Sequence, residues 1–182
     1  FFSPQGYAVT KGILPLIKEA KETIDVSIFF LTHNKISKAL VDAKERGVKV
    51  RVILDATAAT NGYSKHNYLR ENGIDVKVES WGGKMHMKAA VIDSKHIIVG
   101  SMNWTLAGEK KNDENTILIN NSPELGVQLF LFFEKMWNSI PDSYLQKDPF
   151  PESIESGTSC YDLIDNDFDD IIDANEKECL KK

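Results

Sequence analysis

The stretch "KMHMKAAVID" (residues 84–93) places a histidine and a lysine two positions apart at the start of an apolar run. The alanines, valine and isoleucine that follow predict a strand buried in a sheet. Because alternate side chains of a strand share a face, His86 and Lys88 should point the same way, whereas Asp93 has the opposite parity and should point elsewhere. We therefore expect a strand over 86–93 that carries two polar side chains at one edge of a sheet.

The next segment should return polar groups to the same edge. "HIIVG" (residues 96–100) predicts a second strand, and a hairpin turning at residues 94–95 would bring Ser101 and Asn103 back beside His86. An imidazole, an ammonium, a hydroxyl and an amide would then converge. This set suits a tetrahedral anion such as phosphate, because lysine supplies charge, serine and asparagine donate hydrogen bonds, and histidine can attack or transfer a proton.

Around these strands, strand-like and helix-like segments alternate along the chain. This order predicts an α/β sandwich with a mixed sheet. Further strands are expected over 23–31, 48–54, 74–80 and 115–120, and helices over 34–46, near 65–71 and over 122–137, the last with Ser122 as its cap.

The amino-acid composition limits the class of protein. The 182 residues are 42% hydrophobic and 27% charged, as in a globular protein, and the longest apolar run is too short to cross a membrane.

We expect a catalytic domain over 1–140, a proline- and serine-containing linker over 141–159 and an acidic appendage over 160–182. The last 32 residues hold ten acids and three lysines, a net charge of −7, and the remainder holds 17 acids and 19 bases, a net charge of +2. A polyanion can bind to such a body.

The acidic appendage contains "DNDFDDIIDANE" (residues 165–176). Its acids have the oxygen-ligand spacing of an EF-hand-like calcium loop, and it also resembles the Asp-rich calcium repeats of secreted proteins, although Asp170 stands where glycine is usual. The expected ligands are Asp165, Asp167, Asp169, the carbonyl of Ile171, Asp173 and Glu176. A disordered acidic tail without a ligand is the alternative.

Both cysteines, Cys160 and Cys179, flank this loop. A disulfide between them would staple the appendage and favour an exported protein, whether extracellular, periplasmic or on the cell surface. Two free thiols in a cytoplasmic protein are the alternative.

The pattern His86-x-Lys88-x4-Asp93-x6-Gly100-Ser101-x-Asn103 resembles the signature of the phospholipase D superfamily. Similarity also covers most of residues 1–140, including "FFSP" at the expected first strand, "DVSIFFLTH", "ALVDAKERGVKVRVILD", "LRENGIDVK" and "NDENTILI". A single motif in so short a chain is most similar to the small nuclease branch, in which two chains build one active site. The resemblance therefore implies a homodimer.

The resemblance also implies a role for each residue. His86 would attack phosphorus to form a covalent phosphohistidine, and the partner's His86 would protonate the leaving oxygen and then activate water. Lys88 and Asn103 would hold the non-bridging oxygens. Ser101 would support them, and Glu114 would orient the imidazole. Asp93 belongs to the signature, but its parity favours a structural role; no metal is implied for catalysis.

The substrate is less constrained. Lys84, Lys110 and Lys111 lie near the motif and suit a nucleic-acid backbone, although they are equally expected as solvated surface lysines. We therefore favour an endonuclease acting on DNA or RNA. Two alternatives stay open: a phospholipase D-type lipid hydrolase, and a non-catalytic phosphate- or calcium-binding module.

Overall fold

The computed structural model describes residues 1–79 and 84–150, together with a few positions of the C-terminal segment: Cys160, Tyr161, Leu163, Ile171, Ile172, Lys177, Cys179 and Leu180. A seven-stranded sheet forms the centre in the order β1-β7-β6-β5-β2-β3-β4. Strands β2, β3 and β4 run parallel and the other pairs antiparallel, so the sheet is mixed. The strands are β1 (Phe2–Ser3), β2 (Thr23–Ile28), β3 (Lys49–Asp55), β4 (Asp75–Glu79), β5 (Lys88–Ile92), β6 (His96–Gly100) and β7 (Glu114–Ile119).

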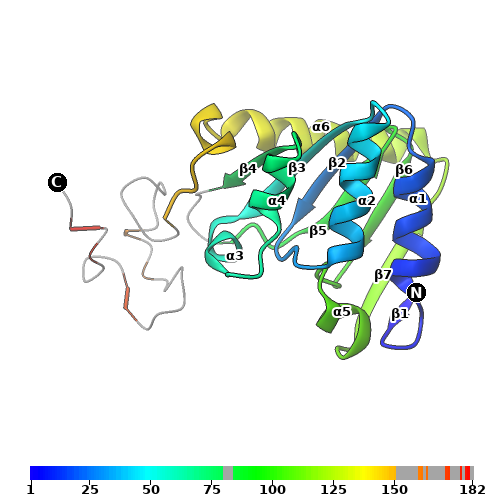
Figure 1. Cartoon of the computed structure of the whole chain (residues 1–182), viewed down its shortest axis with the longest axis horizontal. Coiled ribbons are helices and arrows are strands. Elements are labelled where there is room, and N and C mark those ends of the chain that lie inside the picture. Colours follow the sequence, from blue (N-terminus) through cyan, green and yellow to red (C-terminus); the bar gives the residue numbers. More distant parts are fainter. Residues whose placement is uncertain are drawn as a thin grey trace.

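Helices cover both faces of this sheet (Figure 1), which confirms the expected α/β class. One face carries α1, α2 and α4, and α6 lies across the other. The helices are η1 (Ala8–Ile13), α1 (Leu14–Glu19), α2 (Asn34–Glu45), α3 (Ala56–Thr60), α4 (His66–Glu71), α5 (Leu106–Lys110), α6 (Pro123–Ser139) and η2 (Asp142–Leu145). Ser122 precedes α6, as expected, but its side chain makes no capping hydrogen bond. No helix in the described part of the chain is long and apolar enough to span a membrane.

Strands β5 and β6 form the expected hairpin at the middle of the sheet. The turn places Asp93 (φ 50°) and Ser94 (φ 52°) in the left-handed region, where aspartate is enriched. The Asp93 carboxylate turns away from the sheet edge that carries His86 and accepts hydrogen bonds from the backbone N–H groups of residues 21–23 at 2.8–3.3 Å. Burial acts to raise the pKa of Asp93, but these donors outweigh it and hold the pKa below 3.8.

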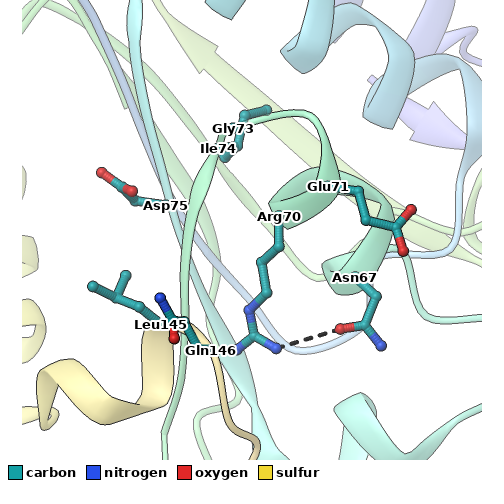
Figure 2. A pocket seen from close by; sticks show the side chains of 8 residues that line it. All are labelled: Asn67, Arg70, Glu71, Gly73, Ile74, Asp75, Leu145 and Gln146. Carbon is teal, nitrogen blue, oxygen red and sulfur yellow. Dashed lines mark hydrogen bonds between the residues drawn. The ribbon is translucent and has the colours of Figure 1, made fainter.

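The chain after α6 packs against the domain. Tyr144 is buried, and the Asp148 carboxylate pairs with His66 at 2.9 Å and with Arg70 at 2.7 Å. Arg70 also donates to the carbonyls of Val76 and Tyr144, so residues 141–150, expected as part of a linker, cover the β4 edge of the sheet. A hollow of about 580 Å³ lies beside Arg70 (Figure 2), but that guanidinium is already engaged in holding this segment.

A buried ion network fixes α6 to the sheet. Arg51 of β3 donates to Asp25 of β2 at 2.7 Å and to Glu134 of α6 at 2.5 Å, and its guanidinium lies 4.9 Å from the Phe133 ring centroid. Burial raises the pKa of Asp25 even though Arg51 opposes this. One oxygen of Asp25 has no hydrogen-bond partner among the described residues. Arg51 is therefore the main cation that compensates for the burial of Asp25.

Replacing Arg51 should destabilise the fold strongly. Arg51→Ala leaves the Asp25 carboxylate buried without its cation, which typically costs about 3–5 kcal/mol in the free energy of unfolding. Urea denaturation followed by circular dichroism measures this change. Lys38→Ala removes the exposed Lys38–Asp42 pair and serves as the control, with an essentially unchanged midpoint expected. Equal midpoints for the two variants would contradict the role given to Arg51.

Candidate active site

Lys88 begins the central strand β5, and its side chain is only 8% exposed. Its Nζ donates to the carbonyl oxygen of His86 at 2.7 Å and lies 5.0 Å from the Phe29 ring centroid. Burial lowers the pKa of Lys88, while the charges of Glu114 and Asp55 act against that shift. A positive charge is thus held at a fixed point of the sheet edge.

His86 lies just before β5 rather than inside it. The expected strand over 86–93 is shorter because its neighbour β2 ends at Ile28, and only the Phe29 N–H to Met87 carbonyl bond (3.0 Å) continues the pairing. The exposed imidazole packs one side against the Phe29 ring, with centroids 4.6 Å apart. Partial desolvation, followed by the charge of Lys88, lowers the pKa of His86 below 6.5. This shift favours the neutral form of the ring, which is the form that a nucleophile requires.

Ser101 and Glu114 meet on the other side of Lys88. The Ser101 hydroxyl donates to the Glu114 carboxylate and accepts from the Asn115 N–H at 3.1 Å. The second carboxylate oxygen accepts from Asn112 at 3.2 Å. These bonds follow from the pairing of β6 with β7, which sets Ser101 beside Glu114. Within this chain Glu114 thus bonds to Ser101 and Asn112, and its expected role in orienting the His86 imidazole stays a prediction.

Asn103 lies in the loop after β6. Its Oδ1 accepts from the Phe30 N–H at 3.3 Å, so the NH2 group is the half of the amide that remains to donate to a substrate. The loop is also bonded to the chain after β2 through Trp104, whose N–H donates to the Phe30 carbonyl at 3.0 Å. A buried pair, His33 and Glu109 at 3.1 Å, also links the start of α2 to α5, the helix that follows this loop.

Asp55 is a site residue that the sequence-based reasoning missed. It ends β3, is 1% exposed, and caps α3 by accepting from Thr57 at 2.9 Å. Its other oxygen accepts from the Met85 N–H at 2.9 Å, directly before His86. Acids at the carboxyl ends of parallel strands often face a ligand site, and this signal was present in "VRVILD" (residues 50–55).

The three lysines expected to bind substrate differ in their surroundings. Lys84 donates to the Thr57 hydroxyl at 2.7 Å, close to Asp55. Lys110 and Lys111 are exposed at the end of α5, and Lys110 lies 3.6 Å from Glu109. All three stay predicted to bind substrate.

The calcium loop falls almost wholly outside the described residues. Of its expected ligands only Ile171 is described, so calcium binding by Asp165, Asp167, Asp169, Asp173 and Glu176 stays a prediction. Cys160 and Cys179 form a disulfide that links the two ends of this segment. Within the described part of the chain, no group of three or more His, Cys, Asp or Glu side chains is placed to hold a metal ion.

Taken together, the sheet edge presents an imidazole, a buried ammonium, a hydroxyl bonded to a carboxylate and an amide donor. Register explains the arrangement: Lys88 stands between Ile28 of β2 and the end of β6, and β6 pairs with β7 at Gly100 and Thr116. Asp93 lies at the opposite end of β5. The site can supply a nucleophile and two groups, the Lys88 ammonium and the Asn103 amide, that stabilise negative charge on a phosphoryl oxygen.

Residues 13–137 match the profile of a family described as cardiolipin synthase, PLD-like domain. A phospholipase D of Rickettsia prowazekii is 38% identical over 121 residues, covering 66% of this chain and 58% of that protein. The human mitochondrial cardiolipin hydrolase is 33% identical over 143 residues, covering 78% of this chain and 56% of that protein. The chain thus spans a little over half the length of these two relatives.

Solved structures agree with the sequence matches. Nuc from Salmonella typhimurium, a phospholipase D family member, superimposes with a TM-score of 0.74 at 34% identity, covering 77% of this chain and 93% of that one. NucT from Helicobacter pylori gives a TM-score of 0.69 at 25% identity over 77% and 96% of the two chains. With a matching profile over most of its length and these relatives, the chain belongs to the phospholipase D-like superfamily.

Proposed function

We propose that this chain is a phosphodiesterase that hydrolyses nucleic-acid phosphodiester bonds through a covalent phosphohistidine. The observation that carries the proposal is the pairing of His86 with Lys88. One is an exposed imidazole with a lowered pKa, and the other is a buried cation bonded to the same backbone. A phosphoryl group drawn to Lys88 lies within reach of the imidazole, and no metal ion is required for this chemistry.

The proposed reaction has two displacements. A nitrogen of His86 attacks phosphorus, a P–N bond forms, and the P–O bond to the leaving oxygen breaks. The partner's His86, which must be protonated when this step begins, gives its proton to that oxygen. Water then attacks phosphorus and loses a proton to the same imidazole, and the P–N bond breaks to regenerate the enzyme.

The other groups act on the phosphoryl oxygens. Lys88 and the NH2 group of Asn103 stabilise the negative charge that grows in each transition state. The Ser101 hydroxyl gives its hydrogen to Glu114, so we assign it a supporting role through that bond, and Glu114 keeps the proposed role of orienting the imidazole. Lys84, Lys110 and Lys111 lengthen the positive rim along which a polymer backbone lies.

A polymer substrate is favoured over a lipid by the surroundings of the site. Met85 and Trp104 are buried, so their apolar surface is not available to acyl chains. Lipid hydrolysis is the second candidate, because relatives carry the names phospholipase D and mitochondrial cardiolipin hydrolase. A non-catalytic phosphate- or calcium-binding module is the third.

We also propose that the protein is exported. The Cys160–Cys179 disulfide supports this location, since such bonds persist in oxidising compartments.

A substrate panel tests the proposed reaction. Single-stranded DNA, duplex DNA, RNA and cardiolipin vesicles are incubated with the protein, with and without EDTA. Cleavage of a nucleic acid that persists in EDTA is expected, together with an acid-labile phosphoryl adduct on the protein. His86→Ala should abolish both, whereas His96→Ala, which removes an imidazole at the far end of the hairpin, should retain them. Turnover of the lipid alone would replace the nuclease assignment, and equal behaviour of the two variants would refute catalysis by His86.

The pH dependence tests the electrostatics of His86. Because the folded pKa lies below 6.5 and the neutral ring attacks, the acid limb of kcat/KM should fall below pH 6.5. Asp55 acts to raise this pKa, so Asp55→Asn should move the limb to still lower pH. It should also lower kcat by roughly 10- to 100-fold through loss of positioning. NMR titration of the His86 ring checks the shift independently of activity, and an unchanged titration would contradict the influence assigned to Asp55.

Mixing wild type with His86→Ala tests the shared site. Wild-type and His86→Ala chains are mixed in equal amounts and allowed to pair at random. If one active site uses the histidines of two chains, the mixture should have about a quarter of the activity of a wild-type sample at the same total protein concentration. Independent sites would keep about half. Subunit exchange is checked by native mass spectrometry, and a strictly monomeric protein that turns over substrate would contradict the homodimer.

A further inference from the structure

Two grooves cross the helical face of the domain away from the residues of the catalytic edge. The first, about 270 Å³, lies between α2 and α4 and is lined by Lys38, Lys65 and Tyr68 among others. The second, about 370 Å³, lies between α1 and α2 and is lined by Lys18, Lys35, Lys38 and Arg46 among others. Lys38 lines both, so the two grooves lie on either side of α2 and adjoin at this residue; together they are called the path.

The path carries a marked excess of positive charge. The residues lining the two grooves include five bases and one acid, Asp42, which pairs with Lys38 at 2.7 Å. Lys18, Lys35 and Lys65 form no ion pair with any described residue. Their charges are therefore available to an anion.

One end of the first groove lies close to the catalytic edge without including its residues. Asn103 accepts from the Phe30 N–H, and the next residue, Leu31, accepts from the Lys65 N–H at 2.9 Å. Lys65 and Asn103 thus lie on either side of one short piece of chain. A phosphate chain leaving the site over Phe30 meets Lys65 first and then enters the groove between α2 and α4.

The composition of the groove walls indicates the ligand. Tyr68 is 38% exposed on the groove wall, and Tyr63, just before Lys65, is 80% exposed. Tyrosines placed among lysines are typical of sites where bases of a single strand stack on aromatic rings.

We infer that these grooves bind a single nucleic-acid strand and lead it to the catalytic edge, with Lys65 and Lys35 contacting phosphates and Tyr68 stacking on a base. This inference rests on the proposed nuclease function but assigns a binding surface outside the catalytic residues. It also predicts that affinity for the polymer and the rate of the catalytic step can be changed separately, because none of the groove residues is a proposed catalytic residue.

Binding of a fluorescent single-stranded 20-mer to the His86→Ala protein, titrated across salt concentrations, tests the surface. Adding Lys35→Gln and Lys65→Gln should weaken binding about tenfold or more and reduce the slope of log K against log salt by about 0.7 for each phosphate that a lysine no longer neutralises. The matched control is Lys49→Gln with Lys135→Gln, which removes two exposed lysines elsewhere and should change neither value. Equal effects of the two pairs would overturn the inference.

Tyrosine variants test stacking separately. Tyr68→Ala should weaken binding about tenfold, whereas Tyr68→Phe, which keeps the ring, should bind like the parent. Equal affinities of the alanine and phenylalanine variants would remove Tyr68 from the surface.

Cleavage of bis(p-nitrophenyl) phosphate by otherwise wild-type protein separates this surface from the catalytic centre. The Lys35→Gln/Lys65→Gln protein should cleave this small diester at the wild-type rate, because the diester is too short to reach the grooves. Absence of cleavage by the wild type itself would count against the proposed function. Cleavage with unaltered oligonucleotide binding in the groove variant would count against the inference alone. If the Lys35→Gln/Lys65→Gln protein instead lost binding to anionic vesicles and kept its affinity for the oligonucleotide, the grooves would be a membrane-binding surface and the inference would be overturned.

Discussion

The burial of one cation governs the site. Lys88 starts β5, which has three strands on either side in the sheet order, so its backbone is paired with β2 and close to the end of β6. An ammonium in such a place loses water and is retained only because its environment compensates for the loss. The His86 carbonyl, the Phe29 ring and the charges of Glu114 and Asp55 provide that compensation. These groups also surround the candidate site. The same contacts therefore stabilise the buried ammonium and shape the site.

The same charge acts on the proposed nucleophile. Partial desolvation and then the charge of Lys88 lower the pKa of His86, and Asp55 opposes them. Too strong an effect of the lysine would leave the ring a poor proton acceptor, and too strong an effect of the carboxylate would leave it protonated and unable to attack. Asp55 therefore acts on His86 in two ways: through its charge and through its bond to the Met85 N–H, which sets the backbone leading into the ring.

Sequence patterning predicted the elements whose signal is local. The β5–β6 hairpin follows from two apolar runs around a turn, and α2 follows from apolar spacing ended by Gly47, so both agree with the structure within a few residues. Residues 8–19, α3 and α5 were missed because they are short or depend on packing against the sheet. Asp55 was missed because its contact with Met85 spans 30 positions and arises from tertiary structure.

The position of His86 outside the ladder has a mechanistic consequence. A residue within β5 would have both backbone groups committed to neighbouring strands, and its side chain would be held by the pleat. His86 is instead bordered by two fixed points, the Met85 N–H on Asp55 and the Met87 carbonyl on the Phe29 N–H, with its own carbonyl bound by Lys88. The backbone is therefore anchored on both sides of the residue, while the imidazole is exposed and packs one side against the Phe29 ring. The proposed nucleophile needs this combination, because the attacked phosphorus would shift during each displacement while the charges that stabilise it stay in place.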